Sequence, residues 1–156
     1  DYNGAELRVL LALLGYDQPQ HDVHQWNLDN VFENKVTRAE AKTLFFAWLY
    51  GSRSDDVKRH SSLLKEKYNK DSLIDKYWDG HIIRTPFDRD VVSPKHKALN
   101  YLVQAFIVHD ALVIDFDLED RELFKEVQDI FSLTRFGKFP VNKSIGKDFG
   151  SLKEVT

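Results

Sequence analysis

The sequence contains no cysteine, no methionine and no long apolar run. Without cysteine the chain forms neither disulfides nor thiolate metal sites, so any bound metal must use oxygen or imidazole ligands. A helix that spans a bilayer needs about 20 consecutive apolar residues, and none of the apolar runs approaches that length. We therefore expect no membrane association and a cytoplasmic location, the host cytoplasm if the protein is viral.

Because methionine is absent from all 156 residues, we expect a processed product, an engineered fragment or joined pieces of a longer chain. The length suits one domain with a substantial hydrophobic core. The formal net charge of −3 argues against a protein that binds nucleic acid over its whole surface. The basic run from Lys58 to Lys70 is either a solvated helix face or a local patch for an anionic partner.

Apolar periodicity predicts the first helix, in which Leu7, Leu10, Leu11 and Leu14 share one face and Gly15 ends the helix. Further helices are expected at residues 23–32, 37–51, 55–67, 72–77, 94–104 and 117–131. A hairpin or loop is expected at 81–92, a second hairpin at 105–116 and a short strand near the C-terminus. Helices and strands are mixed without a regular βαβ order, which favours the α+β class.

Two of these helices carry specific expectations. Thr37 and Glu40 form the T-x-x-E capping box, which fixes a helix start. The helix at 117–131 should turn its apolar side chains toward a core. These side chains are Leu123, Val127, Ile130 and Phe131.

The helix that begins at Thr37 has an unusual charge distribution. Arg38 and Lys42 occupy its first turns, where unpaired N–H groups already carry partial positive charge. Phe46 follows on the same stripe, with Tyr50 further round. Such an end suits a polyphosphate, and a ring one turn on could stack on a base. The alternative is an amphipathic helix whose basic residues are merely exposed.

Carboxylates provide a second set of candidates. His109 and Asp110 lie between two apolar, strand-like runs, where Asp110 is either a turn residue or a rigidly held metal ligand. Asp1 is a second candidate, and Glu6 follows at the start of the first helix. Two aspartates around Mg²⁺ ions would suit phosphoryl transfer with two metals.

Together these segments resemble family A DNA polymerases, the group that includes bacterial DNA polymerase I and T7-like phage polymerases. "DYNGAELRVLLALLG" is similar to the first motif, D-Y-S-x-I-E-L-R, and "RAEAKTLFFAWLYG" has the R-x3-K-x3-F-x3-Y-G spacing of the second. "IVHDALV" resembles the third, V-H-D-E, and the order of the motifs is the family's. Shorter matches are "DVH", "TPFDR", "NYLVQ" and "GKDFG".

The resemblance implies template-directed DNA synthesis, with two Mg²⁺ ions and transfer from a dNTP to a primer 3′-hydroxyl. Asp1, Asp110 and the backbone carbonyl of Tyr2 would hold the metal ions, and Lys42 would protonate the departing pyrophosphate. The residues that would bind the dNTP are Glu6, which selects deoxynucleotides, His24, Arg38, Lys42, Phe46 and Tyr50. Those that would contact primer–template DNA are Tyr50, Gly51, Arg89, Asn100, Gln104 and His109.

The resemblance also implies a domain organisation. Residues 1–21 and 96–156 would form the palm, a small antiparallel sheet backed by helices, and residues 22–95 a helical fingers subdomain. No segment matches a thumb or an exonuclease domain. The family has a few dozen residues between its counterparts of Gln104 and Ala105, so we expect a segment to be missing at that junction. The sequence does not indicate which replisome or processivity partner the chain would bind.

Three alternatives stay open. A single-subunit RNA polymerase shares the palm, but Glu6 and Phe46 argue against ribonucleotide use. A non-catalytic remnant could bind DNA or a partner protein, and Ala111, where the family has Glu, favours it. A plain helical binding module requires the motif spacing to be chance.

Overall fold

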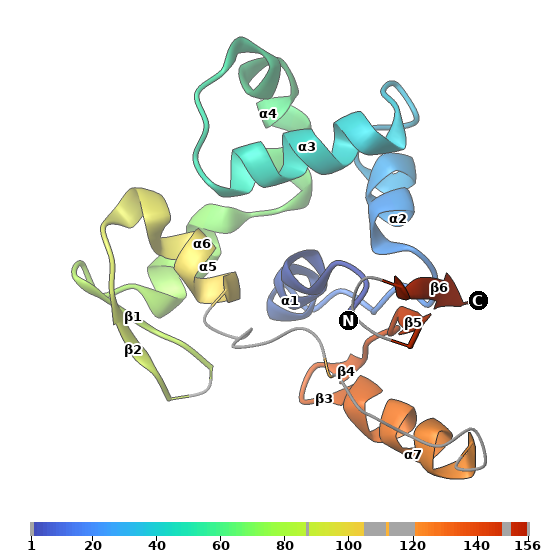
Figure 1. Ribbon diagram of the computed structural model, residues 1–156. Helices are drawn as coiled ribbons and strands as arrows, with labels where there is room; N and C mark the ends of the chain where they lie inside the picture. Colours follow the sequence, from blue (N-terminus) through green and yellow to red (C-terminus); the bar gives the residue numbers. More distant parts are fainter. Residues whose placement is uncertain (1, 87, 105–111, 113–120, 148–150, 156) are drawn as a thin grey trace.

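The computed structural model describes residues 2–86, 88–104, 112, 121–147 and 151–155. Within these residues the chain is an α+β protein with seven α-helices, one 3-10 helix and three antiparallel two-stranded sheets, as the sequence predicts at this level (Figure 1). The helices are α1 (Ala5–Leu13), α2 (Val23–Asn30), α3 (Arg38–Leu49), α4 (Asp55–Lys67), α5 (Lys70–Tyr77), η1 (Lys95–Lys97), α6 (Ala98–Gln104) and α7 (Arg121–Ser132). The paired strands are β1 (Ile82–Arg84) with β2 (Asp90–Val92), β3 (Leu133–Thr134) with β4 (Gly137–Lys138), and β5 (Lys143–Ile145) with β6 (Lys153–Val155).

Local capping explains where the helices begin. The predicted capping box of α3 is present: Thr37 N–H donates to Glu40 Oε2 at 2.8 Å, and Glu40 N–H donates to Thr37 Oγ1 at 3.3 Å. Helix α4 has the predicted bounds. Helix α5 begins earlier than expected because the Asn69 side chain caps it, accepting from Ser72 N–H at 3.3 Å.

Residues 2–104 form what we call the helical part, which contains most of the core. Leu7, Leu10 and Leu11 of α1 are fully buried, which confirms the predicted apolar face. Helix α3 packs between α2 and α4, and α1 packs against α6 (Figure 1). Phe45 of α3 makes an edge contact with Tyr68, with ring centroids 5.6 Å apart. Each fully buried large apolar side chain contributes about 1.5–3 kcal/mol, so this cluster dominates the stability of the helical part.

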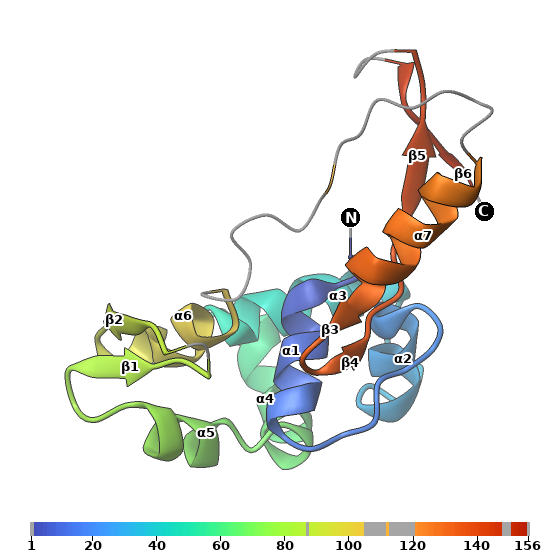
Figure 2. The same cartoon turned by 90° about the horizontal axis from the view of Figure 1, so that it is seen from below.

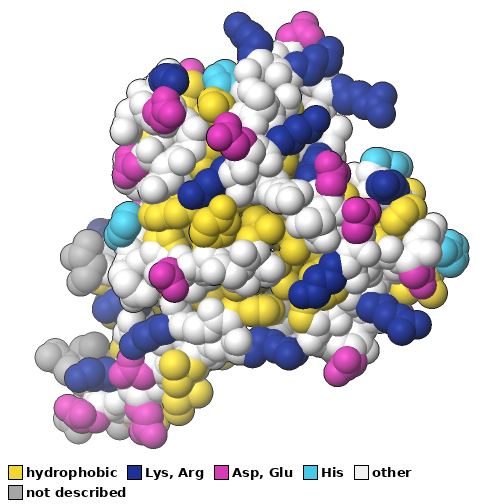
Figure 3. Space-filling view, turned by 180° about the vertical axis from the view of Figure 1, so that it is seen from behind, with side chains coloured by type: hydrophobic (Ala, Val, Ile, Leu, Met, Phe, Trp, Pro, Cys, Tyr) yellow, Lys and Arg dark blue, Asp and Glu magenta, His cyan; other side chains and the backbone are white. Residues whose placement is uncertain are grey.

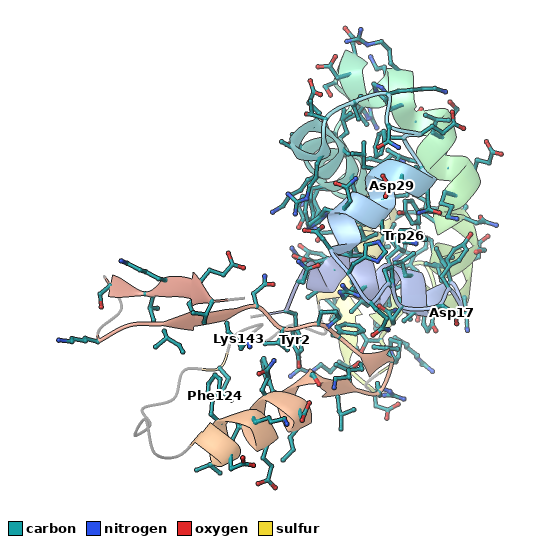
Figure 4. All side chains as sticks on the ribbon, turned by 90° about the vertical axis from the view of Figure 1, so that its right-hand side faces the viewer. Tyr2, Asp17, Trp26, Asp29, Phe124 and Lys143 are labelled. Carbon is teal, nitrogen blue, oxygen red and sulfur yellow. The ribbon has the colours of Figure 1, made fainter. Side chains whose placement is uncertain are left out.

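Residues 121–155 form the C-terminal part, in which α7 and the β5–β6 pair extend away from the helical part, whereas β3 and β4 lie beside α1 (Figure 2). Tyr2 connects the two parts, as Figure 4 shows. Its ring stacks on Phe131 with centroids 4.6 Å apart, and its hydroxyl donates to the Phe131 carbonyl at 2.7 Å. Tyr2 also forms an isolated antiparallel bridge with Val141 and an edge contact with Phe139. The contacts of Tyr2 across the junction are therefore largely aromatic, and Phe139 extends them into the core.

The expectation that α7 turns its apolar residues inward is wrong at two positions. Leu123 is 55% exposed and Ile130 is 63% exposed, whereas Val127 and Phe131 are half-buried. Of the described elements, α7 packs mainly against the strand that follows it, β3. Periodicity defines the apolar face of a helix, but it does not determine whether another element covers that face.

Several predicted features lie outside the described residues. These are Asp1, the hairpin at 105–116 with His109 and Asp110, Ala111 and the junction that begins at Ala105. The described strands form three separate pairs, and the tail contains β5 as predicted together with the unexpected β3, β4 and β6. None of the helices in the described segments combines the length and apolar character that a membrane span requires.

Candidate functional site

Helix α3 carries the predicted cationic stripe. Arg38 and Lys42 are exposed in its first two turns, and Phe46 is half-buried one turn further on. The ring centroids of Phe46 and Tyr50 are 5.8 Å apart. Because residues four positions apart lie next to each other on a helix face, two cations lead into two aromatic rings along one side of α3.

His24 joins this stripe from α2. It is 4% exposed, and its ring centroid lies 5.8 Å from that of Phe46. Burial and the charge of Lys42 lower the pKa of His24 to about 4, against the opposing effect of Asp22. The imidazole is therefore neutral at pH 7. Its Nδ1 is a buried polar atom without a hydrogen-bond partner within the described segments.

Gly4 allows the start of α1 to approach His24. Its φ of 65° lies in the left-handed region, which favours glycine. A Cβ atom at this position would lie 2.4 Å from Val23 Cγ1 and 3.1 Å from His24 Nε2. The first distance is too short for a real contact, so the close packing of α1 against the start of α2 depends on Gly4.

Tyr50 links three helices. Gln104 of α6 donates its side-chain N–H to the Tyr50 hydroxyl at 3.3 Å. Burial raises the pKa of Tyr50, and the nearby negative charge of Glu6 on α1 raises it further. His24 of α2, the aromatic rings of the α3 stripe and Gln104 of α6 therefore lie in one series of contacts, on which Glu6 of α1 acts only through its charge.

Asp22 is a site residue that the sequence analysis missed as a separate candidate. Its Oδ1 accepts from the backbone N–H groups of His24 at 2.8 Å and Gln25 at 2.9 Å, which caps α2. Its Oδ2 forms an ion pair with Arg38 Nη2. An Asp immediately before a helix is a recognised N-cap signal, which could have identified its first role. Nothing local indicates the pairing with Arg38, sixteen residues away.

Arg8 is a second residue whose role the sequence does not reveal. It is fully buried, and its guanidinium donates to the carbonyls of Asn3 at 2.7 Å, Pro19 at 2.7 Å and His21 at 2.8 Å. Burial lowers the pKa of Arg8 to about 10, against the opposing effect of Asp22. The side chain remains charged at pH 7 and ties the first residues to the loop that leads into α2.

A pocket of about 500 Å³ lies beside the Asp22–Arg38 ion pair. It is lined by Asn3, Gln20, His21, Asp22, Arg38, Pro140, Asn142 and Glu154. The pocket therefore extends from the N-terminal ends of α2 and α3 to the β5–β6 pair of the C-terminal part. Its volume is in the range of small-molecule sites.

Of the predicted DNA residues, His109 lies outside the described segments, and the others lie on or near α6 and the β1–β2 hairpin, which packs against α6. Gly51 ends α3 with a φ of 80°, and a Cβ there would lie 3.5 Å from the carbonyl oxygen of His96. Asn100 has a buried Oδ1 without a hydrogen-bond partner within the described segments. Arg89 lies in the β1–β2 turn, where its carbonyl accepts from Thr85 N–H at 2.9 Å.

Of the three predicted metal-binding groups, only Tyr2 is described. The bridge beside it joins Asn3 N–H to the Pro140 carbonyl at 3.0 Å, so the Tyr2 carbonyl takes no part in that bond. Two carboxylates and a carbonyl would make an all-oxygen donor set, which is the set that Mg²⁺ prefers. In the described segments no three His, Asp or Glu side chains gather as a metal-binding group.

The basic run from Lys58 to Lys70, which lies mainly on α4, resembles a solvated face more than a binding patch. Lys58 and Arg59 each pair with an Asp one turn earlier on α4. Lys67 lies over the ring of Trp26 at 5.1 Å, and Lys70 lies over Trp48 at 4.9 Å. In Figure 3, Lys and Arg side chains are scattered over the visible face and do not form one stripe.

Comparison of the chain with protein-family models, with curated proteins and with solved structures found no match.

Proposed function

We propose that the chain is the palm and fingers core of a DNA-directed DNA polymerase. One observation carries the proposal: residues selected by motif spacing in separate segments make contact with one another. The His24 ring lies beside Phe46, and Gln104 donates a hydrogen bond to Tyr50, which is the neighbour of Phe46 along α3. Glu6 acts electrostatically on Tyr50, and Lys42 on His24. A chance resemblance of unrelated helices gives no reason for this convergence.

In this proposal the cationic end of α3 binds the triphosphate of an incoming dNTP. Arg38 offers a planar set of N–H donors, Lys42 a mobile point charge, and His24 a neutral imidazole. The N-terminal N–H groups of α3 add positive potential. Phe46 packs on the sugar and base, and Glu6 occupies the space that a ribose 2′-hydroxyl would need. Lys42 is also the proton donor to the departing pyrophosphate.

The proposed metal ligands are Asp1, Asp110 and the Tyr2 carbonyl. Bound Mg²⁺ would supply charge stabilisation at the reacting phosphate and activation of the primer hydroxyl. The ligands come from the first residues and from the segment after α6, which the proposal assigns to the palm (1–21 and 96–156).

Duplex DNA would meet the protein at the end of α3 and along α6. Tyr50 and Gly51 would abut the templating pair, and Asn100, Gln104, Arg89 and His109 would contact the duplex. Asn100 and Gln104 are four residues apart on α6, so both amides lie on one helix face. The fingers would comprise residues 22–95.

The direct test is single-nucleotide incorporation on a primed template with Mg²⁺. Asp110→Ala should abolish incorporation, and Lys42→Ala should lower its rate by about 100-fold or more, the usual contribution of a positioned general acid. Lys35→Ala is the matched control, because Lys35 is an exposed lysine paired with Glu33 just before α3. Incorporation that persists unchanged in Asp110→Ala would refute the proposal.

A non-catalytic remnant that binds DNA or a partner protein is the second candidate, and Ala111 in the third motif favours it. Calorimetry with dATP and Mg²⁺ separates the two. A polymerase core binds dATP in a manner that depends on Lys42, whereas a remnant has no reason to bind it.

A further inference from the structure

We propose that Asp22 is a positioning residue of the triphosphate site, which sets the relative placement of His24 and Arg38. The inference rests on the proposed function, because both residues are assigned there to the triphosphate. Asp22 itself would not contact the nucleotide. It would act by holding two phosphate-binding side chains from different helices in one fixed arrangement.

The two oxygens of the Asp22 carboxylate have different partners. Oδ1 accepts from the backbone N–H groups of His24 and Gln25, which fixes the first turn of α2 and the direction in which the His24 ring leaves it. Oδ2 pairs with Arg38 Nη2 in the first turn of α3. One side chain therefore connects the N-terminal ends of two helices, and each end carries a proposed phosphate ligand.

This pairing leaves Arg38 able to bind phosphate. A guanidinium has five N–H donors, and the recorded contact with Asp22 uses only Nη2. Arg38 is a long, exposed side chain that would otherwise sample many rotamers, and ordering such a side chain reduces affinity. Asp22 performs this ordering before the ligand arrives.

The charge of Asp22 has an opposing effect, because a carboxylate near a triphosphate repels it. The groups that face Asp22 include Arg38 and Gln25 N–H, and its charge also acts on Arg8 and His24. Bonds from Arg38 and from the helix N–H groups hold the pKa of Asp22 below its usual range, although burial acts in the opposite direction. The carboxylate is thus already neutralised by fixed partners, which reduces its repulsion of a bound phosphate. We therefore expect the ordering effect to exceed the repulsion.

The experiment measures binding of dATP, and separately of inorganic tripolyphosphate, by calorimetry with Mg²⁺ in 0.15 M salt. Asp22→Asn is the informative variant, because Asn caps helices as well as Asp but has no charge for Arg38. Asp29→Asn removes one carboxylate from the other end of α2, where Asp29 accepts from Gln25, and is the matched control (Figure 4). Arg38→Ala and the double variant with Asp22→Asn complete a double-mutant cycle.

Asp22→Asn should weaken the binding of both probes by about 2- to 10-fold, the cost of ordering one long side chain. Asp29→Asn should leave affinity unchanged. In the Arg38→Ala background, Asp22→Asn should produce no further weakening, which a general loss of structure could not reproduce. Thermal unfolding of each variant identifies any loss of fold, and Asp22→Ser, which caps α2 but is too short to reach Arg38, serves as a second test.

Unchanged or tighter binding by Asp22→Asn would overturn the role of Asp22 and leave the proposed function intact. Equal weakening with and without Arg38 would also overturn it. If the unaltered chain binds neither probe, the proposed function fails and the inference fails with it.

Discussion

The helical part and the C-terminal part differ in how many of their large apolar side chains are buried. In the helical part, Phe45 and Leu102 are buried within a shared core. In the C-terminal part, Phe139 packs into that same core, whereas Ile130 and Leu133 are 63% and 67% exposed. Both parts contain amphipathic helices, so the sequence pattern alone does not separate them. The difference indicates that the helical part carries the stability of the fold, and every described side chain assigned to the nucleotide lies there as well.

The largest expected effect is in the helical core. Phe45→Ala removes a fully buried ring that contacts Phe46, Trp48 and Tyr68. We expect the free energy of unfolding to fall by about 3–5 kcal/mol, because a cavity replaces the ring. Chemical denaturation at pH 7 measures it. Thr43→Ala, at an exposed position of the same helix, should change stability by less than about 0.5 kcal/mol. A loss below 1 kcal/mol for Phe45→Ala would contradict the assignment of the core.

The junction between the parts gives the next largest effect. Tyr2→Ala removes the stack on Phe131, the edge contact with Phe139 and the hydroxyl bond to the Phe131 carbonyl. Because Tyr2 is only half-buried, we expect a loss of about 2–3 kcal/mol. Tyr2→Phe keeps both ring contacts and should cost about 1 kcal/mol. Hydrogen exchange should show the loss of protection in Tyr2→Ala concentrated in β3 and β4. Uniform loss across α1 to α6 would show that the two parts are not separable.

The buried His24 of the helical part should make the free energy of unfolding depend on pH. Burial lowers the pKa of His24 to about 4 in the folded chain, whereas the unfolded chain binds this proton near pH 6.5. As the pH falls below 6.5, protonation of the imidazole therefore favours the unfolded chain. Stability from this group is fully present above pH 6.5 and is lost as pH falls from 6.5 toward 4. Between pH 7 and pH 5 we expect the free energy of unfolding to fall by at most about 2 kcal/mol from this source.

His24→Gln should remove that part of the pH dependence, measured by denaturation at both pH values. His81→Gln, an exposed histidine in the turn before β1, is the control and should leave the slope unchanged. An unaltered slope in His24→Gln would contradict the burial of the neutral imidazole.

Local signals predicted much of the helical part. The capping box of Thr37 and Glu40 and the bounds of α4 follow from side chains within a few residues of each helix end. The contacts among the proposed nucleotide residues join distant segments, and spacing alone could not predict them. The family resemblance selected those residues, and the fold brings them together.

Other features were beyond local signals. Arg8 looks like an exposed cation in the sequence, yet it is fully buried, and the carbonyls of Asn3 and of two residues in the α1–α2 loop accept its hydrogen bonds. The ion pair between Asp22 and Arg38 is likewise not predictable locally, because the fold brings together two residues that are distant in the sequence. For α7, periodicity grouped four apolar residues on one face, but Leu123 and Ile130 of that face are exposed, because its coverage depends on tertiary contacts that no local pattern specifies.

The smallest expected effect tests the comparison most directly. Ile130→Gln replaces an apolar side chain that is 63% exposed, so little burial is lost and the free energy of unfolding should change by less than about 0.5 kcal/mol. Leu102→Gln in α6, which is 1% exposed, is the matched change and should cost several kcal/mol, because it buries an amide without a partner. Denaturation of both variants at pH 7 measures the difference. If Ile130→Gln costs as much as Leu102→Gln, the apolar face of α7 is covered in solution, and the C-terminal part contributes to stability as the helical part does.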